Sequence, residues 1–237
     1  MIDGKKIIAM IPARMGSQRL PRKNTALIGG QPLVGYAIDA AKACPYFDEI
    51  VVNTNDPKVK EIAKQKEVSV FDRSEEKASS SAKSDEVVQE FLESHPCDII
   101  CWINTTSPLQ PHGEIKKTID HFNEENLDSL FTVYEESVHC NMNQEGINYK
   151  TNELFAKTQD LPPVSRFVYS VMMWDSKTFL KAMDENGNGL FCGKTGTFPV
   201  SKLTSLIVKN ENDLMMVDYI TRGMKDNSQY QINYYEA

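Results

Sequence analysis

Short apolar segments alternate with amphipathic, helix-like segments over residues 6–134. The strand-like segments are residues 6–12 (KIIAMIP), 49–55 (EIVVNTN), 68–71 (VSVF), 98–104 (DIICWIN) and 128–134 (DSLFTVY). The helix-like segments are residues 32–43, 56–66, 84–94 and 113–126. Strands that alternate with helices form a mostly parallel sheet covered on both faces, because each crossover lays a helix on the sheet. The sequence therefore predicts an α/β fold with a doubly wound, mostly parallel sheet.

This alternation stops between residues 136 and 168. The segment is polar, contains the turn sequence QEG and ends near Pro162 and Pro163, which predicts an inserted β-hairpin or arm. Regular order is expected again as a strand at 168–175, a helix from Ser176, a strand at 197–201 and a helix at 211–225, followed by a frayed tail of a dozen residues. We expect one domain over residues 1–237, with residues 136–168 as an arm within it.

Several classes of protein are disfavoured by the composition. No apolar run approaches the ~20 residues that cross a bilayer, and the first twelve residues lack the apolar core of a signal peptide. The five cysteines are scattered and form no C-x-x-C pair, which favours free thiols over disulfides or zinc ligands. The four histidines are also too far apart for a metal site. These features predict a cytoplasmic protein that is not bound to a membrane.

Positive charge is concentrated at the start of an otherwise acidic chain. Residues 1–24 carry a net charge of +5, so the remainder carries −12 to give the total of −7. Nucleic-acid binding needs a broad basic face, which an acidic protein does not offer. A local basic segment in such a chain indicates a small, concentrated anion.

The cationic segment is residues 13–24 (ARMGSQRLPRKN), directly after the first predicted strand. Ligands of open α/β sheets bind at the carboxyl ends of the strands, where this loop is expected to lie. Its candidate anion-binding residues are Arg14, Gly16, Ser17, Arg19 and Lys23. Glycine and serine can turn backbone N–H groups toward an anion, and the cations can meet phosphate oxygens. The loop matches neither a Walker A nor a G-x-G-x-x-G pattern, and a solvated basic loop with Pro21 as a rigid turn remains the alternative.

The segments IPARMGSQRLPRKN, GGQPLVGYAIDAA, IVVNTND, INTTSPLQ and DSLFTV together resemble a known family. They are similar to the cytidylyltransferases that activate 3-deoxy-2-ulosonic acids, especially the CMP-N-acetylneuraminate synthetases and their pseudaminic and legionaminic acid relatives. The resemblance is in good register over about residues 6–135. It implies a nucleotidyltransferase fold of the glycosyltransferase-A type, the use of CTP and Mg²⁺, and a homodimer formed through the arm.

The resemblance also implies roles for individual residues. Arg14 and Lys23 would be catalytic, the first wrapping the triphosphate with the loop glycine and serine, and the second neutralising the α-phosphate region. The implied nucleotide-binding residues are Ala13, Arg14, Gly16, Ser17, Lys23, Asn24, Arg73 and Ser84. Asn104 occupies the position where the family usually has a glutamine near the acceptor sugar.

Two departures from the family pattern concern the metal and the acceptor. Where the family has two aspartates before the last helix, this chain has Ile207 and Lys209. The nearest carboxylate, Asp213, is expected to stabilise the helix N-terminus with Asn210 as N-cap, rather than to bind metal. The metal ligands stay unassigned, and we expect Mg²⁺ to be held weakly, mainly by the phosphates of the nucleotide. The segment before residue 168 also has fewer arginines than the family, which leaves the acceptor open.

The expected function is transfer of CMP from CTP to an acidic sugar, such as a sialic-type acid, with release of pyrophosphate. The partners are then CTP and an acidic small-molecule acceptor, in a homodimer that binds neither nucleic acid nor membrane. Two alternatives remain: CMP transfer to a phosphonate or sugar-phosphate acceptor, and a nucleotide-binding homologue without turnover.

Overall fold

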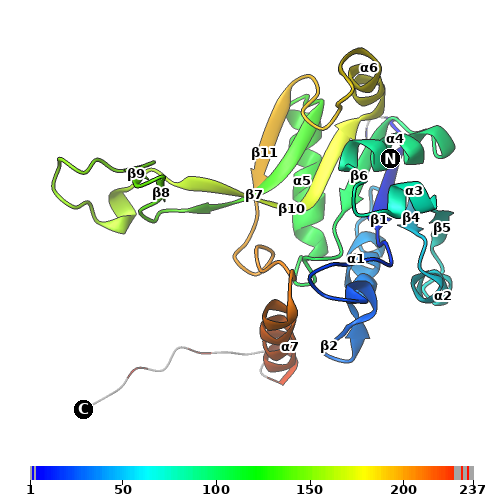
Figure 1. The fold of residues 1–237 in the computed structure, drawn as a ribbon, viewed down its shortest axis with the longest axis horizontal. Helices are drawn as coiled ribbons and strands as arrows, with labels where there is room; N and C mark the ends of the chain where they lie inside the picture. Colours follow the sequence, from blue (N-terminus) through cyan, green and yellow to red (C-terminus); the bar gives the residue numbers. More distant parts are fainter. Residues whose placement is uncertain (1, 3, 227–230, 232–233, 235–237) are drawn as a thin grey trace.

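A seven-stranded sheet forms the centre of the protein in the computed structural model, which describes residues 2, 4–226, 231 and 234 (Figure 1). The strand order is β11-β7-β10-β6-β1-β4-β5. The bounds are β1 (Ile7–Pro12), β4 (Glu49–Thr54), β5 (Ser69–Asp72), β6 (Ile99–Ile103), β7 (Ser129–Glu136), β10 (Val164–Asp175) and β11 (Thr195–Pro199). β10 is antiparallel to both its neighbours, and the other neighbouring strands pair in parallel. The predicted α/β fold with a mostly parallel sheet is confirmed.

Helices cover both faces of this sheet. One face packs against α1 (Leu33–Lys42), α2 (Pro57–Gln65) and α5 (His112–Glu124), and the other against α4 (Ser84–Ser94) and α6 (Ser176–Asn186). Successive side chains of a strand point to opposite faces, and β1 shows this directly. Ile7, Ala9 and Ile11 lie in the first core cluster, whereas Ile8 and Met10 lie in the second. Because both faces are buried, the central strands read as continuous apolar runs.

Two of the predicted helix starts are confirmed by their capping contacts. The backbone N–H of Lys58 donates to the Asp56 side chain over 2.9 Å at the start of α2. At α7 (Glu211–Asp226), Asp213 N–H donates to Asn210 Oδ1 over 3.0 Å. The Asp213 carboxylate in turn accepts from the backbone N–H groups of Lys209 (2.8 Å) and Asn210 (3.1 Å). The carboxylate therefore stabilises the helix N-terminus, as predicted.

An arm formed by residues 137–163 projects from the body between β7 and β10 (Figure 1). It contains the short hairpin of β8 (Asn141–Met142) and β9 (Glu145–Gly146) and the single turn η2 (Thr158–Asp160). The prediction that the returning strand begins at residue 168 was wrong, since β10 already pairs with β7 from Val164. The pairing is irregular between Phe167 and Met172, where Tyr169 has φ 57°. This irregularity breaks the side-chain alternation, so the sequence does not show that the strand is continuous.

Several short elements around the sheet were not predicted. They are the single turn η1 (Lys23–Thr25), the strand pair β2 (Leu27–Ile28) and β3 (Gln31–Pro32), and the short helix α3 (Glu75–Ala78). Among the described residues, none of the helices combines the length and the apolar character needed to cross a membrane. Of the predicted frayed tail, only residues 226, 231 and 234 are described, so that prediction falls largely outside the described part of the chain.

Candidate functional site

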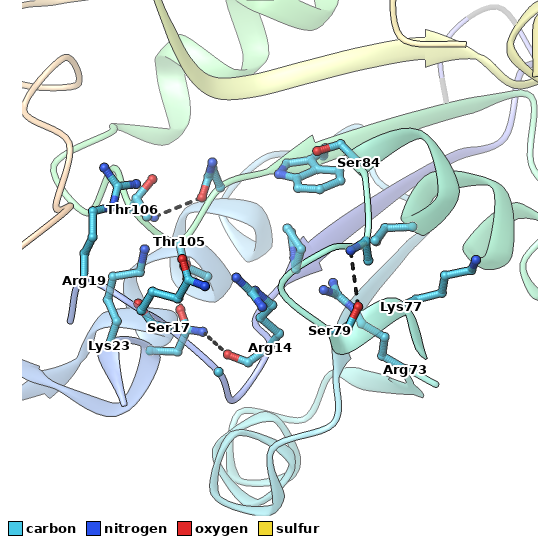
Figure 2. Close-up of a pocket in the computed structure, with 18 residues that line it drawn as sticks. Arg14, Ser17, Arg19, Lys23, Arg73, Lys77, Ser79, Ser84, Thr105 and Thr106 are labelled. Carbon is cyan, nitrogen blue, oxygen red and sulfur yellow. Dashed lines mark hydrogen bonds between the residues drawn. The ribbon is translucent and has the colours of Figure 1, made fainter. Parts of the chain in front are cut away.

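A cavity of about 350 Å³ lies where the segments after β1, β5 and β6 converge (Figure 2). Pro12 ends β1 at its edge, and Asn104 follows β6 directly. The lining residues are Pro12, Arg14, Gly16, Ser17, Gln18, Arg19, Lys23, Asn24, Arg73, Lys77, Ser79, Ala82, Ser84, Val87, Trp102, Asn104, Thr105 and Thr106. The cavity therefore occupies the carboxyl edge of the parallel strands, where open α/β sheets bind ligands.

Five cations surround this cavity. Figure 2 shows Arg19 and Lys23 at one end, Arg73 and Lys77 at the other, and Arg14 between them. Burial lowers the pKa of Lys23 below its ordinary value of 10.5, and the neighbouring guanidiniums of Arg19 and Arg14 lower it further. Cations that repel one another in a partly buried space are stabilised by an anion placed between them. The electrostatics of the cavity favour a multiply charged anion.

A buried amide joins the cationic loop to the end of β6. The Asn24 side chain donates to the backbone carbonyl of Arg14 over 3.0 Å and accepts from the Thr105 hydroxyl over 2.8 Å. Asn24 is 7% exposed and Thr105 is 3% exposed, so the hydrogen bond between these two side chains is shielded from water. Arg14 also donates from its guanidinium to the carbonyl of Ala78 over 3.2 Å. These contacts hold the loop across the cavity from two sides.

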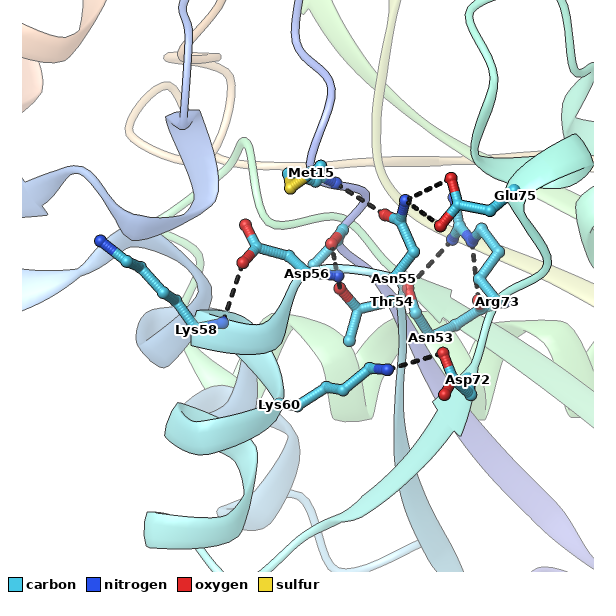
Figure 3. A network of polar contacts seen from close by, with 11 residues as sticks. Met15, Asn53, Thr54, Asn55, Asp56, Lys58, Lys60, Asp72, Arg73 and Glu75 are labelled. Carbon is cyan, nitrogen blue, oxygen red and sulfur yellow. Dashed lines mark hydrogen bonds and ion pairs between the residues drawn. The ribbon is translucent and has the colours of Figure 1, made fainter.

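Arg73 is fixed by a second buried amide (Figure 3). Its Nε donates to Asn53 Oδ1 over 2.7 Å, and a terminal nitrogen donates to the Asn53 carbonyl over 3.1 Å. Burial lowers the pKa of Arg73 from its ordinary value to about 10, against the opposing effect of the Glu90 carboxylate and with a further lowering from Arg14. A buried guanidinium held on one side by Asn53 can offer its remaining donors only in a defined direction. That arrangement suits recognition of a specific acceptor group on a ligand.

Another part of the cavity wall comes from the segment between α3 and the start of α4. Ser79 Oγ accepts from the backbone N–H of Ala82 over 3.2 Å, which shapes the turn that leads into Ser84. Asn104 Oδ1 accepts from the backbone N–H of Thr106 over 3.3 Å, so its amide is oriented by the turn after β6.

Eight of the nine predicted site residues line the same cavity. They are Arg14, Gly16, Ser17, Lys23, Asn24, Arg73, Ser84 and Asn104. Ala13 is the exception: it is 1% exposed in the core, its N–H donates to the Asn53 carbonyl, and its carbonyl accepts from Thr54 Oγ1. Its side chain and its backbone groups are therefore occupied within the protein.

The predicted site set missed Lys77, Ser79 and Trp102. Lys77 and Ser79 come from a segment whose only sequence signal is that it follows a strand. Trp102 lies inside an apolar run that predicts a buried strand, and its indole N–H is buried without a hydrogen-bond partner among the described residues. Nothing in that run distinguishes the indole from the core side chains around it.

The lining residues do not fit a metal site. None of them is a carboxylate, and the described residues contain no cluster of three or more His, Cys, Asp or Glu able to hold a metal ion. Ile207 and Lys209 line another cavity of about 260 Å³, together with Arg166 and Asp213. Mg²⁺ prefers carboxylate oxygens and phosphates, so the protein side chains around the main cavity offer it no ligand set.

The sequence pattern of the family described as Cytidylyltransferase matches residues 8–186. The N-acylneuraminate cytidylyltransferase of Streptococcus agalactiae serotype V is 26% identical over 244 residues, which cover 97% of this chain and 58% of the relative. The N-acylneuraminate cytidylyltransferase of Oncorhynchus mykiss is 33% identical over 55% of this chain, which corresponds to 31% of its own length. The pseudaminic acid cytidylyltransferase of Campylobacter jejuni serotype O:2 is 28% identical over 74% of this chain and 81% of its own length. This chain thus spans little more than half of the streptococcal relative.

Solved structures share the fold at low sequence identity. A CMP:2-keto-3-deoxy-manno-octonic acid synthetase complexed with CTP superposes with a TM-score of 0.64 at 14% identity, covering 92% of this chain and 98% of the other. A 4-diphosphocytidyl-2C-methyl-D-erythritol synthase from Anaerococcus prevotii reaches 0.66 at 12% identity, covering 93% and 100%. These likenesses establish a nucleotidyltransferase-type fold. Since the family pattern covers most of the chain, including the cationic loop, this protein belongs to the cytidylyltransferase family.

Proposed function

We propose that this protein transfers CMP from CTP to an acidic sugar and releases pyrophosphate. The observation that carries the proposal is the cavity at the strand ends, where five cations from separate segments surround a space of about 350 Å³. A triphosphate is a small anion of high charge, which such a cavity stabilises. Membership of the cytidylyltransferase family supports cytosine as the base.

The chemistry that this cavity can support is positioning and charge stabilisation. A hydroxyl oxygen of the acceptor attacks the α-phosphorus in line, the bond from the α-phosphorus to the pyrophosphate oxygen breaks, and the hydroxyl proton passes to solvent. The cationic side chains of Arg14 and Lys23 stabilise the charge that develops on the phosphate oxygens. Arg73, oriented by Asn53, and Ser84 hold the nucleotide, and Asn104 faces the acceptor. The side chains hold the reactants in line, which by itself accelerates such a transfer.

An acidic acceptor is supported by the cavity of about 260 Å³ that Ile207 and Lys209 line. The backbone N–H of Val208 donates to the carbonyl of Thr106 over 2.8 Å, so residues 207–209 lie against the edge of the nucleotide cavity. Arg166 and Lys209 line the cavity of about 260 Å³ beside this segment, together with the carboxylate of Asp213. A guanidinium and an ammonium together favour a carboxylate. The relatives named for N-acylneuraminate and pseudaminic acid point to the same class of acceptor.

We also propose a cytoplasmic homodimer that forms through the arm. Leu154 and Phe155 are 97% and 84% exposed, and both border an apolar hollow on the arm. Exposed large apolar side chains that gather on a projecting segment favour a protein partner. A second copy of this chain is the partner proposed, with the arm reaching the acceptor side of its neighbour. The five cysteines are all free, in keeping with a reducing compartment.

The test is pyrophosphate release with CTP across a panel of acceptors. The panel contains a sialic acid, pseudaminic acid, a 3-deoxy-octulosonic acid, a phosphonate and a sugar phosphate, each also assayed with UTP and ATP. Release that requires CTP and an ulosonic acid supports the proposal. Release with the phosphonate or the sugar phosphate alone would favour the second acceptor class, and CTP binding without release under every condition would favour a binding protein.

A further inference from the structure

We propose that this protein binds the metal-free nucleoside triphosphate, with its own side-chain cations neutralising the phosphates and no protein carboxylate holding a divalent ion. The inference rests on the proposed function, because it concerns how the same cavity meets CTP. It also departs from the Mg²⁺ that the family resemblance implies.

The first argument is the composition of the cavity wall. All of its charged lining residues are cations, namely Arg14, Arg19, Lys23, Arg73 and Lys77. The loop after β1 contributes three of them, and the segment after β5 contributes Arg73 and Lys77, of which Lys77 points away from Arg14 in Figure 2. Sites that hold Mg²⁺ against phosphate usually add one or two protein carboxylates to the phosphate oxygens, and this wall has none. The positive charge at this wall is instead carried by arginine and lysine side chains of the protein.

The second argument is that the carboxylates next along the chain have other partners. Glu76 and Glu86 pair with Lys77 at 2.8 and 3.5 Å, so the ammonium of Lys77 is already balanced by carboxylates, and the charge offered to a ligand comes from Arg14, Arg19, Lys23 and Arg73. Asp85, which follows Ser84, accepts from the backbone N–H groups of Gly189 and Leu190 at 2.8 and 3.1 Å. None of these three acids lines the cavity. Glu90 is not a lining residue either. Its charge acts on the guanidinium of Arg73, while its Oε2 is buried without a hydrogen-bond partner among the described residues.

The third argument concerns the segment before α7. Val208 is fully buried and packs in a cluster with Leu20 and Ile28, while Ile207 and Lys209 on either side of it line the other cavity. The two positions where the resembling enzymes carry aspartates therefore share one face, but one is apolar and the other is a cation. The nearest carboxylate is that of Asp213, which also lines that cavity and whose Oδ2 accepts from both backbone N–H groups of the α7 cap. The segment adds positive charge and no metal ligand.

The consequence is a preference for one form of the nucleotide. A triphosphate that carries Mg²⁺ is less negative than the free triphosphate, so a wall of fixed cations attracts the free form more strongly. A protein site that supplies carboxylates has the opposite preference, because it repels the free triphosphate and needs the ion as a bridge.

The experiment is calorimetric titration of the full chain with CTP, once in EDTA and once in excess Mg²⁺, at matched ionic strength. We expect an affinity in EDTA that equals or exceeds the affinity in Mg²⁺. In EDTA, Arg19→Ala lowers the affinity about tenfold, with a smaller loss in Mg²⁺, and the matched variant Lys202→Ala, at an exposed lysine outside the cavity, binds as the parent does. Mg²⁺ titrated into the nucleotide-free protein gives no saturable heat.

Results that contradict the inference can be told apart from results that contradict the proposed function. A weaker CTP affinity after chelation, saturable Mg²⁺ binding without nucleotide, or an Arg19→Ala variant that binds as the parent in both buffers overturns this inference and leaves the proposed function standing. Absence of CTP binding in both buffers overturns the proposed function together with the inference.

Discussion

Replacement of Asn24 by alanine should both destabilise the fold and weaken nucleotide binding. The Asn24 amide connects the backbone of the cationic loop at Arg14 to the Thr105 hydroxyl after β6. Alanine removes both hydrogen bonds at once. The loop then keeps the Arg14 contact with Ala78, the hydrogen bond from the Met15 N–H to Asn55 Oδ1 and the packing of Leu20 in its core cluster.

The magnitude follows from the exposure of the two partners. Thr105 is 3% exposed, so its hydroxyl loses its acceptor without access to water, which costs about 1–3 kcal/mol. Arg14 is half-buried, so water can reach its carbonyl more easily and the loss there is about 1 kcal/mol, the net value of an ordinary hydrogen bond. The free energy of unfolding should therefore fall by about 2–4 kcal/mol, a large part of the ~5–15 kcal/mol typical of a domain.

The assay is urea unfolding of the parent, Asn24→Ala, Thr105→Val and the double variant, with CTP affinity measured on each. If the two side chains act as a bonded pair, the double variant loses about 1–2 kcal/mol less than the sum of the single variants, because no buried hydroxyl is left without its acceptor. CTP affinity should fall with Asn24→Ala, since the cationic loop is then less ordered. A loss below about 0.5 kcal/mol for Asn24→Ala, or strictly additive single effects, would refute this reasoning.

Three further outcomes are expected. Arg14→Ala and Lys23→Ala should each weaken CTP binding by about 1.5–3 kcal/mol in calorimetry and lower initial rates, while Lys202→Ala should not; parent-like variants would mean that the loop is only a basic surface. The pKa of Lys23 is lowered by burial and by two guanidiniums, and the phosphates of bound CTP should raise it again. CTP binding just below pH 10.5 should therefore take up protons, and the affinity should fall as the pH rises through the pKa of Lys23 in the complex. Buffers of different ionisation enthalpy detect this uptake, and a heat independent of the buffer speaks against it. In sedimentation at micromolar concentration the parent should be a dimer and Leu154→Ser/Phe155→Ser a monomer, whereas a monomeric parent contradicts the proposed role of the arm.

The sequence alone predicted the elements whose causes are local. The apolar run at β6 and the alternating faces of β1 follow from side-chain spacing, and the starts of α2 and α7 follow from Asp56 and Asn210. The cationic loop was also recognisable, because glycine and cations directly after a strand must lie at the edge of the sheet. These features depend on residues a few positions apart, so they can be read without knowing the fold.

The tertiary structure decided which distant residues share the site. Lys77 follows β5, and the cationic loop follows β1. The two segments border the same cavity only because β4 alone separates β1 from β5 in the sheet, an order that no local pattern encodes. Ala13 belongs to the recognised motif, yet packing turns it into the core. The start of β10 depends on its register against β7, whose paired residues lie 28 (Val164 and Glu136) to 45 (Trp174 and Ser129) positions away in sequence. The lack of a carboxylate on the cavity wall likewise depends on long-range contacts, since Asp85 bonds the backbone N–H groups of Gly189 and Leu190. Local propensity determines the elements, but only long-range packing determines which of their side chains meet, because that depends on strand order and on competition among many partners.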